Sequence, residues 1–126
     1  MTPDESLIRP VEITLHNASR LLALRYADGR EFRLSWEFLR VYSPSAEVVG
    51  HAPDQEVLQT GKKDVTVTRI EPIGHYAIRL VFSDGHDSGL YSWAYLFELG
   101  KNEKQLWQTY LDRLADEGGS RDTLTP

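Results

Sequence analysis

Residues 82–93 read Phe-Ser-Asp-Gly-His-Asp-Ser-Gly-Leu-Tyr-Ser-Trp, and this stretch connects a strand to a helix through a tight turn. Asp84-Gly85 supplies the residue types that accept the positive φ of a hairpin turn. Ser92 is a favoured N-cap, so a helix is expected to begin near Trp93. The stretch therefore predicts a strand, a turn, a short return strand and a helix in that order.

The same order of features occurs earlier in the chain. The paired patterns are Leu24-x-Tyr26-x-Asp28-Gly29 with Leu34-Ser35-Trp36-x-x-Leu39, and Leu80-x-Phe82-x-Asp84-Gly85 with Leu90-Tyr91-Ser92-Trp93-x-x-Leu96. The spacing from glycine to tryptophan is one residue longer in the second copy. We interpret the chain as two pseudo-repeated β-β-β-α units that form antiparallel sheet structure, which is an α+β fold.

Alternation of apolar and polar residues marks the strands. It predicts strands at residues 11–16, 21–26, 31–34 and 64–70, and around Ile78, Leu80 and Phe82. Pro72-Ile73-Gly74 is expected to end the strand before it, and residues 43–63 lack a sustained period and are predicted to be a long irregular connection. Trp36 and Trp93, each just after an N-cap serine, are predicted to be core residues between helix and sheet.

A C-terminal amphipathic helix is predicted from an apolar stripe at helical spacing. The stripe comprises Leu106, Trp107, Tyr110, Leu111 and Leu114, and we expect it to dock on the sheet. Gly100 is expected to end the preceding helix, and Asn102-x-x-Gln105 resembles a capping box that opens the last one. The predicted organisation is a flexible arm at 1–10, one domain at 11–117 and a disordered tail at 118–126.

Composition excludes several classes of function. The 126 residues include no cysteine, which excludes disulfides, thiolate metal sites and cysteine nucleophiles. A formal charge of −5 without a long basic cluster argues against nucleic-acid binding. The chain has no apolar run of membrane-spanning length and no leader pattern at Met1, so we predict a cytoplasmic protein that does not contact a membrane.

Several residues together carry a resemblance to a known family. They are Trp36-x-x-Leu39-Arg40, Ser43-x-Ser45 and Phe82-x-Asp84-Gly85-His86-x-x-Gly89-x-Tyr91-x-Trp93-x-x-Leu96. Over residues 11–112 the chain resembles the gamma-butyrobetaine hydroxylase-like N-terminal domain family. The resemblance implies the small stand-alone bacterial form of unknown function. Other members of that family precede carnitine-biosynthesis oxygenases or accompany iron–sulfur carrier ATPases.

The resemblance also implies a position for a metal site. In the oxygenases this domain holds zinc through three cysteines and one histidine, and those positions correspond here to Ser43, Ser45, Val48 and His86. Serine is a poor zinc ligand and the valine side chain cannot bind zinc, so the tetrahedral site is not expected to form. The resemblance thus implies the fold and leaves only His86 as a candidate metal ligand.

His86 has several interpretations. It can hydrogen-bond the hairpin to the 43–48 loop in place of zinc, bind a metal with His51, His75, Asp84 or Asp87, or contact a ligand or partner. A catalytic Ser-His-Asp set from Ser43 or Ser45, His86 and Asp84 lacks the sequence context of a hydrolase. Tyr91 is the aromatic residue most expected to touch a ligand.

These residues lead to one main hypothesis and one alternative. The main hypothesis is a non-catalytic accessory or protein-interaction module without a cofactor. Its surface would comprise the His86 hairpin and the 43–53 loop, with Ser43, Ser45, His51, Asp84, His86, Asp87 and Tyr91 as candidate contact residues. The alternative is a zinc- or iron-binding protein associated with iron–sulfur trafficking.

Overall fold

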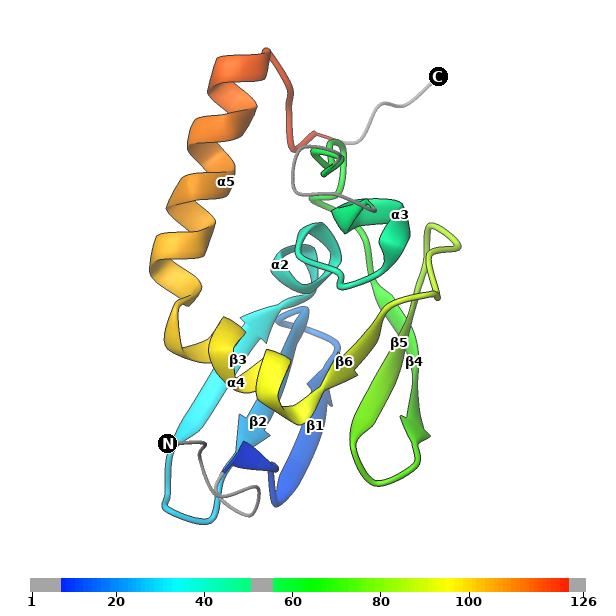
Figure 1. Cartoon of the computed structure of the whole chain (residues 1–126), viewed down its shortest axis with the longest axis vertical. Coiled ribbons are helices and arrows are strands. Elements are labelled where there is room, and N and C mark those ends of the chain that lie inside the picture. The colour runs from blue at the N-terminus through cyan, green and yellow to red at the C-terminus, as the bar shows by residue number, and fades with distance from the viewer. Residues whose placement is uncertain (1–7, 51–55, 123–126) are drawn as a thin grey trace.

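The computed structural model describes residues 8–50 and 56–122, which form two antiparallel sheets and a set of helices (Figure 1). The first sheet and the helices after it comprise β1 (Glu12–His16), β2 (Leu21–Arg25), β3 (Glu31–Ser35), α2 (Trp36–Val41) and α3 (Ala46–Val49). The second sheet and its helices comprise β4 (Val67–Ile73), β5 (Ala77–Phe82), β6 (Leu90–Ser92), α4 (Trp93–Lys101) and α5 (Glu103–Glu117).

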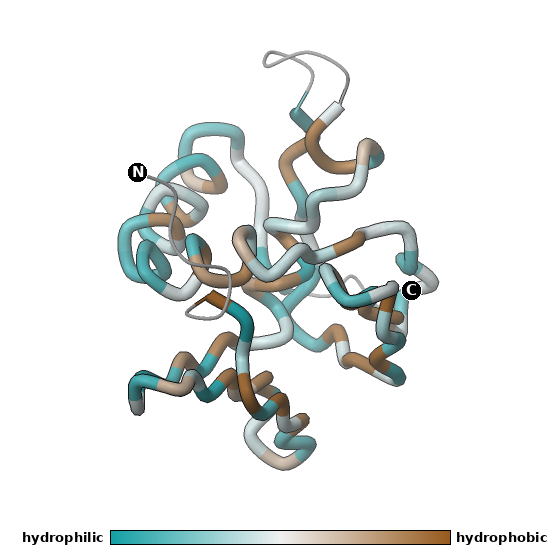
Figure 2. The backbone as a smooth tube through the Cα atoms, turned by 60° about the horizontal axis from the view of Figure 1, so that its bottom comes forward, coloured by the Kyte–Doolittle hydropathy of each residue, from teal (hydrophilic) through white to brown (hydrophobic). Residues whose placement is uncertain are grey.

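Each sheet has three strands in sequence order, β1-β2-β3 and β4-β5-β6. Leu22 lies opposite Leu34 in the first sheet, and Ile78 lies opposite Tyr91 in the second. Hydrophobic and hydrophilic residues alternate along the strands (Figure 2). This alternation directs one face of each sheet into the interior. The predicted α+β class and the two β-β-β units are confirmed.

The two hairpins use the same turn chemistry. Gly29 and Gly85 adopt φ values of 90° and 86°, a region that favours glycine. In each turn the preceding aspartate accepts a hydrogen bond from a backbone N–H two residues later, at 3.0 Å for Asp28 and 3.2 Å for Asp84. The pseudo-repeat therefore extends to the individual hydrogen bonds of the turns.

The predicted N-caps are also confirmed. Ser35 Oγ accepts a hydrogen bond from the Phe38 N–H at 3.0 Å, and Ser92 Oγ accepts one from the Tyr95 N–H at 3.1 Å. A serine side chain in this position satisfies a backbone donor that the first helical turn leaves without a partner. Each cap fixes the point at which a strand ends and a helix begins.

One hydrophobic core joins the two units. It contains Leu22, Leu24, Leu34, Trp36 and Leu39 from the first unit, and Ile78, Leu80, Phe82, Tyr91 and Leu96 from the second. Helix α4 crosses in front of the first sheet (Figure 1), and its Phe97 ring packs edge-on against Phe32 of β3 and against Tyr26, which follows β2. The helix of the second unit thus covers the sheet of the first.

The last helix does not dock on the sheet as predicted. Figure 1 shows α5 standing apart from both sheets, alongside α2. Tyr110 and Leu114 form a second apolar cluster with Val41, and Trp107 packs against Phe38. The apolar stripe was correctly identified, but α4 already covers the sheet surface that the stripe was expected to use.

Three local predictions were wrong. Pro72 lies within β4, which is possible because β4 is an edge strand. Gly100 lies inside α4, where a Cβ atom would stand 2.2 Å from the Phe32 ring, so close packing explains this glycine. Asn102 makes no side-chain cap bond, because its amide donates back to the Glu98 carbonyl. Helix α3, within the connection predicted to be irregular, was not anticipated.

Part of the expected tail is bound to the domain. The Gly61 N–H donates to the Ser120 carbonyl at 2.9 Å, and the Lys63 N–H donates to the Arg121 carbonyl at 3.0 Å. The Arg121 guanidinium makes two hydrogen bonds to Glu37 at 2.7 and 2.8 Å. Residues 118–122 are therefore attached to the domain, whereas residues 1–7 of the expected arm and 123–126 of the tail lie outside the described residues.

The two helix-opening tryptophans differ. Trp36 is 3% exposed and belongs to the core as predicted. Trp93 is only partly buried, and its indole N–H donates to the His75 carbonyl at 2.7 Å. The prediction of a core position therefore holds for Trp36 and is wrong for Trp93.

Candidate functional site

The candidate site lies where the segment after α2 meets the second hairpin turn. Ser45 caps α3, and its hydroxyl accepts a hydrogen bond from the Glu47 N–H. The second hairpin turn, residues 83–89, lies against this segment. The residues predicted from the 43–48 loop and from the His86 hairpin are thus brought together.

His86 connects the two segments through both ring nitrogens. Its Nε2 lies 2.8 Å from Ser43 Oγ, and its Nδ1 lies 3.2 Å from Glu47 Oε2. A neutral imidazole protonated on Nδ1 satisfies both contacts, since it donates to the carboxylate and accepts from the hydroxyl. Ser43 Oγ in turn accepts a hydrogen bond from the Ser45 N–H.

A second hydrogen bond and a close backbone contact complete the connection. The hydroxyl oxygens of Ser45 and Ser88 are 2.7 Å apart. A Cβ atom on Gly89 would stand 2.4 Å from Ser43 Oγ, so only glycine permits the turn to approach this closely. We call Ser43, Ser45, Glu47, His86 and Ser88 the clamp.

A group of charges lies beside the clamp. Asp84 Oδ2 accepts hydrogen bonds from Arg40 Nε at 2.9 Å and from Lys62 Nζ at 2.7 Å. The Arg40 side chain is 8% exposed, and its guanidinium also donates to Gln59 Oε1. Asp84 therefore supplies the charge that compensates a nearly buried arginine.

These surroundings shift two pKa values. Burial alone would raise the pKa of Asp84, but the Lys62 hydrogen bond, the His86 N–H and the Arg40 charge together hold it below its usual value. Burial and the Arg40 charge lower the pKa of His86, although the Glu47 and Asp84 carboxylates oppose that shift. Asp84 is accordingly held charged, and His86 is held neutral.

The four positions at which the family resemblance implies zinc do not form a zinc-binding set. Ser43 and Ser45 are occupied by hydrogen bonds within the clamp, and the apolar Val48 side chain is 4% exposed. Only His86 offers a good zinc donor. Within residues 8–50 and 56–122, no cluster of three or more histidine, aspartate or glutamate side chains is placed to hold a metal ion.

The structure separates the other predicted site residues. Tyr91 is fully buried and its hydroxyl donates to the Leu39 carbonyl at 2.5 Å, so the expectation that it contacts a ligand is wrong. Burial strongly raises its pKa. Asp87 is exposed, His75 lies in the turn between β4 and β5, and His51 falls outside the described residues.

Sequence reasoning missed Arg40, Glu47 and Lys62. Arg40 was noted only as part of a Leu-Arg pair, and its charge partner Asp84 is 44 residues away. Glu47 carried a usable signal, because an acidic residue two positions after an N-cap serine is typical of a first helical turn. Nothing in the local sequence indicates that Lys62 approaches Asp84.

Comparison with known proteins identifies relatives of the chain. Residues 13–97 match the model of a family described as gamma-butyrobetaine hydroxylase-like, N-terminal. No curated protein matches the chain significantly. No helix in the described residues is long and apolar enough to cross a membrane.

Solved structures support the same relationship. A protein with an NMR solution structure is 50% identical, with a TM-score of 0.81 over 95% of this chain and 94% of that chain. A second NMR structure is 47% identical, with a TM-score of 0.81 over 99% and 93%. A crystal structure of a DUF971-family protein of unknown function from Acidithiobacillus ferrooxidans is 40% identical, with a TM-score of 0.63 over 78% and 98%.

Replacing Asp84 with asparagine is expected to destabilise the protein by about 2–3 kcal/mol, since it leaves the nearly buried Arg40 without its carboxylate. Asp28→Asn is the matched control, because Asp28 occupies the same turn position in the first hairpin and pairs with an exposed arginine. The control should cost much less, because an exposed ion pair contributes little to stability. Urea unfolding of both variants tests this, and equal losses would contradict a special role for the Arg40–Asp84 pair.

The lowered pKa of His86 predicts a loss of stability on acidification. Between the ordinary histidine pKa of about 6.5 and the lower folded value, the unfolded chain binds a proton that the folded chain does not. The free energy of unfolding should therefore fall as the pH drops from neutral through this window. His86→Gln should be less stable at neutral pH by about 1–3 kcal/mol, because it disrupts buried hydrogen bonds.

Urea unfolding across this pH range should show a smaller slope for His86→Gln than for the wild type. His75→Gln is the comparison variant, since His75 is exposed and lies outside the clamp. An unchanged slope in His86→Gln would contradict the assignment of the pH dependence to the clamp.

Proposed function

The chain belongs to the gamma-butyrobetaine hydroxylase-like N-terminal family, and we propose that it is a non-catalytic accessory module that binds another protein. The observation that carries this proposal is that the polar side chains of the candidate site are buried and bonded within the protein. Ser43, Ser45 and His86 are at most 6% exposed and hydrogen-bond to one another or to neighbouring segments. They hold the surface in shape and are not available to a substrate.

The surface around the clamp is suited to protein contact. Val49, Val57 and Leu90 are 43%, 53% and 46% exposed, so three large apolar side chains around the clamp are accessible to a partner. The Val57 N–H donates to the Val48 carbonyl at 2.7 Å, which places Val57 beside the end of α3. Leu90 follows the turn that the clamp attaches to α3. We call Glu47, Val49, Val57, Asp87 and Leu90 the clamp surface.

A hydrolase is disfavoured by burial. The distances from Ser43 to His86 and from His86 to Glu47 follow the nucleophile, base and acid order of a catalytic triad. Ser43 is fully buried, and Gly89 packs directly on its hydroxyl oxygen. Asp84, which the sequence suggested as the acid of the triad, pairs instead with Arg40 and Lys62. Its hydrogen bond with His86 is to the backbone N–H and not to the imidazole. The arrangement is explained by the stabilisation of the clamp.

Val49→Asp and Leu90→Asp are expected to weaken partner capture while leaving the fold intact, since both side chains are exposed. Val11→Asp is the control, because Val11 is 56% exposed and lies just before β1, away from the clamp. A captured partner should be purified and titrated against each variant. Its affinity should fall roughly tenfold or more for the two clamp-surface variants, as for interface hot spots. Equal affinities for all three variants and the wild type would overturn the proposed surface.

We also propose that the protein carries no resident zinc or iron. Elemental analysis of protein purified without a metal-affinity tag should find substoichiometric metal in both the wild type and His86→Ala. A variant with Ser43→Cys, Ser45→Cys and Val48→Cys is the positive control, because it restores the implied cysteine positions beside His86 and should take up zinc. One equivalent of metal in the wild type, lost in His86→Ala, would instead support the metal-binding alternative and its association with iron–sulfur trafficking.

A further inference from the structure

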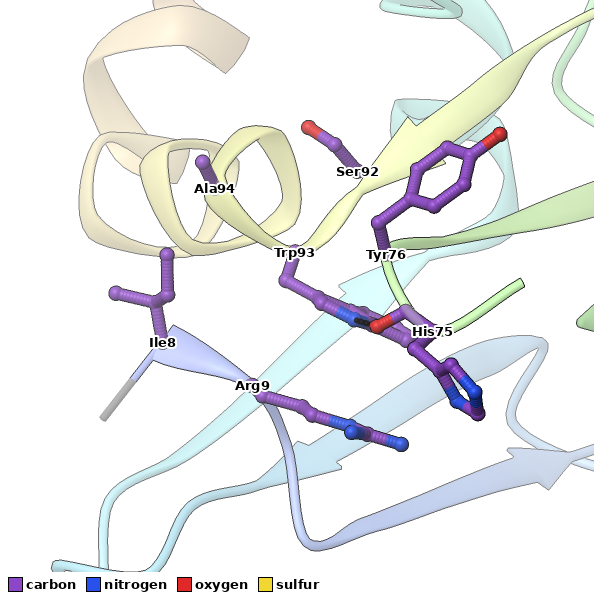
Figure 3. A pocket seen from close by; sticks show the side chains of 7 residues that line it. All are labelled: Ile8, Arg9, His75, Tyr76, Ser92, Trp93 and Ala94. Atoms are coloured by element: carbon purple, nitrogen blue, oxygen red, sulfur yellow. Dashed lines mark hydrogen bonds between the residues drawn. The ribbon is translucent and has the colours of Figure 1, made fainter. Parts of the chain in front are cut away.

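A second candidate site lies at the end of the β4–β5 hairpin opposite the clamp. A pocket of about 500 Å³ is lined by Ile8, Arg9, His75, Tyr76, Ser92, Trp93 and Ala94 (Figure 3). This volume is within the range of small-molecule sites. The pocket shares no residue with the clamp or the clamp surface, so its function can be tested independently of the proposed protein contact.

Trp93 forms a fixed wall of this pocket. Its indole N–H donates to the His75 carbonyl at 2.7 Å, and its backbone N–H donates to the Tyr76 carbonyl at 3.2 Å. The Trp93 side chain is thus held by the turn between β4 and β5, although it is only partly buried. Trp36, the corresponding residue of the first unit, is buried in the core. The second unit therefore exposes at this pocket an aromatic ring that is enclosed in the first unit.

Tyr76 adds a second aromatic side chain to the pocket. It is 62% exposed, which makes it the most exposed large apolar side chain among the described residues. A Cβ atom on Gly74 would lie 2.9 Å from the Tyr76 ring, so the turn is shaped to let this ring pack against the backbone. The hydrogen bonds of the turn to Trp93 keep both aromatic residues at the pocket.

The lining residues carry positive charge and no negative charge. The Arg9 guanidinium lies 5.9 Å from the Trp93 ring centroid and extends toward His75 (Figure 3). No described carboxylate pairs with Arg9. The protein as a whole has a formal charge of −5, so an electropositive pocket opposes its overall charge.

The first turn of α4 supports the same polarity. In the first unit, Glu37 lies in the first turn of α2 and pairs with Arg121. The corresponding residue in α4 is Ala94, and no acidic residue lies in that first turn. The partial positive charge of the α4 N-terminus therefore adds to the charge of Arg9 instead of being offset by a carboxylate.

We propose that this pocket binds a small organic anion in which a carboxylate or phosphate group is attached to a planar ring. The ring would lie against Trp93 and Tyr76, where aromatic contacts contribute beyond the burial of apolar area. The anionic group would lie toward Arg9, whose planar guanidinium matches the geometry of both anions. Neither a free anion nor a neutral ring uses both halves of the pocket.

Ligand titrations of the full chain, followed by two-dimensional NMR, test this proposal. The probes are benzoate and phenyl phosphate, which distinguish a carboxylate from a phosphate. Benzamide is the neutral-ring control, and acetate and inorganic phosphate are the ring-free controls. At least one aromatic anion should saturate at concentrations up to about 10 mM, a range suited to a ligand of this size. The shifts should centre on His75, Tyr76 and the Trp93 indole N–H.

Ala94→Glu gives a variant that separates binding from folding. A carboxylate at a helix N-terminus is favourable for the helix, so the melting temperature should stay the same or rise. The same carboxylate should weaken binding of the aromatic anion roughly tenfold by repulsion within the pocket. Ala94→Gln is the neutral control of matched size and should keep most of the affinity, whereas Arg9→Gln should lose affinity.

Several results would overturn the proposal. They are the absence of saturable shifts with both aromatic anions, equal binding of benzamide or of the ring-free anions, and undiminished binding by Ala94→Glu. Loss of partner capture in the clamp-surface variants with intact binding of the aromatic anion would confirm that the two sites are independent.

Discussion

The hydrogen bond between Ser43 and His86 is the contact on which the arrangement of the candidate surface depends. It joins residues 43 positions apart and lies where both groups are buried. A buried polar group without a partner costs more than a hydrogen bond gains, so each member of the clamp depends on the others. Gly89 must remain small to let the turn reach Ser43, and Ser45 must cap α3 for Glu47 to face the imidazole.

Other polar contacts reinforce the same connection. The Arg40–Asp84 pair and the Tyr91–Leu39 hydrogen bond both run from α2 to the second unit. The apolar core holds the two sheets together without strong directionality, whereas these bonds fix one relative orientation. The two β-β-β-α units therefore form a defined surface where α3 meets the second turn.

The parts of the fold that local chemistry decides could be predicted from the sequence. Ser35, Ser92, Gly29 and Gly85 act through hydrogen bonds and φ values within a few residues, and all four behave as expected. The errors arise where a distant contact decides. Gly100, in helix α4, is explained by the ring of Phe32, which lies on β3 of the first sheet. Ser43 and His86 are also far apart in the sequence, so only the family resemblance indicated that they meet. The contact of Glu47 with His86 was not predicted.

The differences between the two units are more informative than their likeness. A repeated turn and cap serve folding in both copies, so they say little about function. At the helix start the copies diverge, since Trp36 is enclosed and Glu37 is paired with Arg121, whereas Trp93 is partly exposed and Ala94 leaves the α4 N-terminus without a carboxylate. Folding alone does not require an exposed tryptophan beside an arginine without a described ion-pair partner. In the first unit the Glu37 carboxylate occupies the first turn of the helix. In the site that we propose, the anionic group of a ligand takes the corresponding place beside α4.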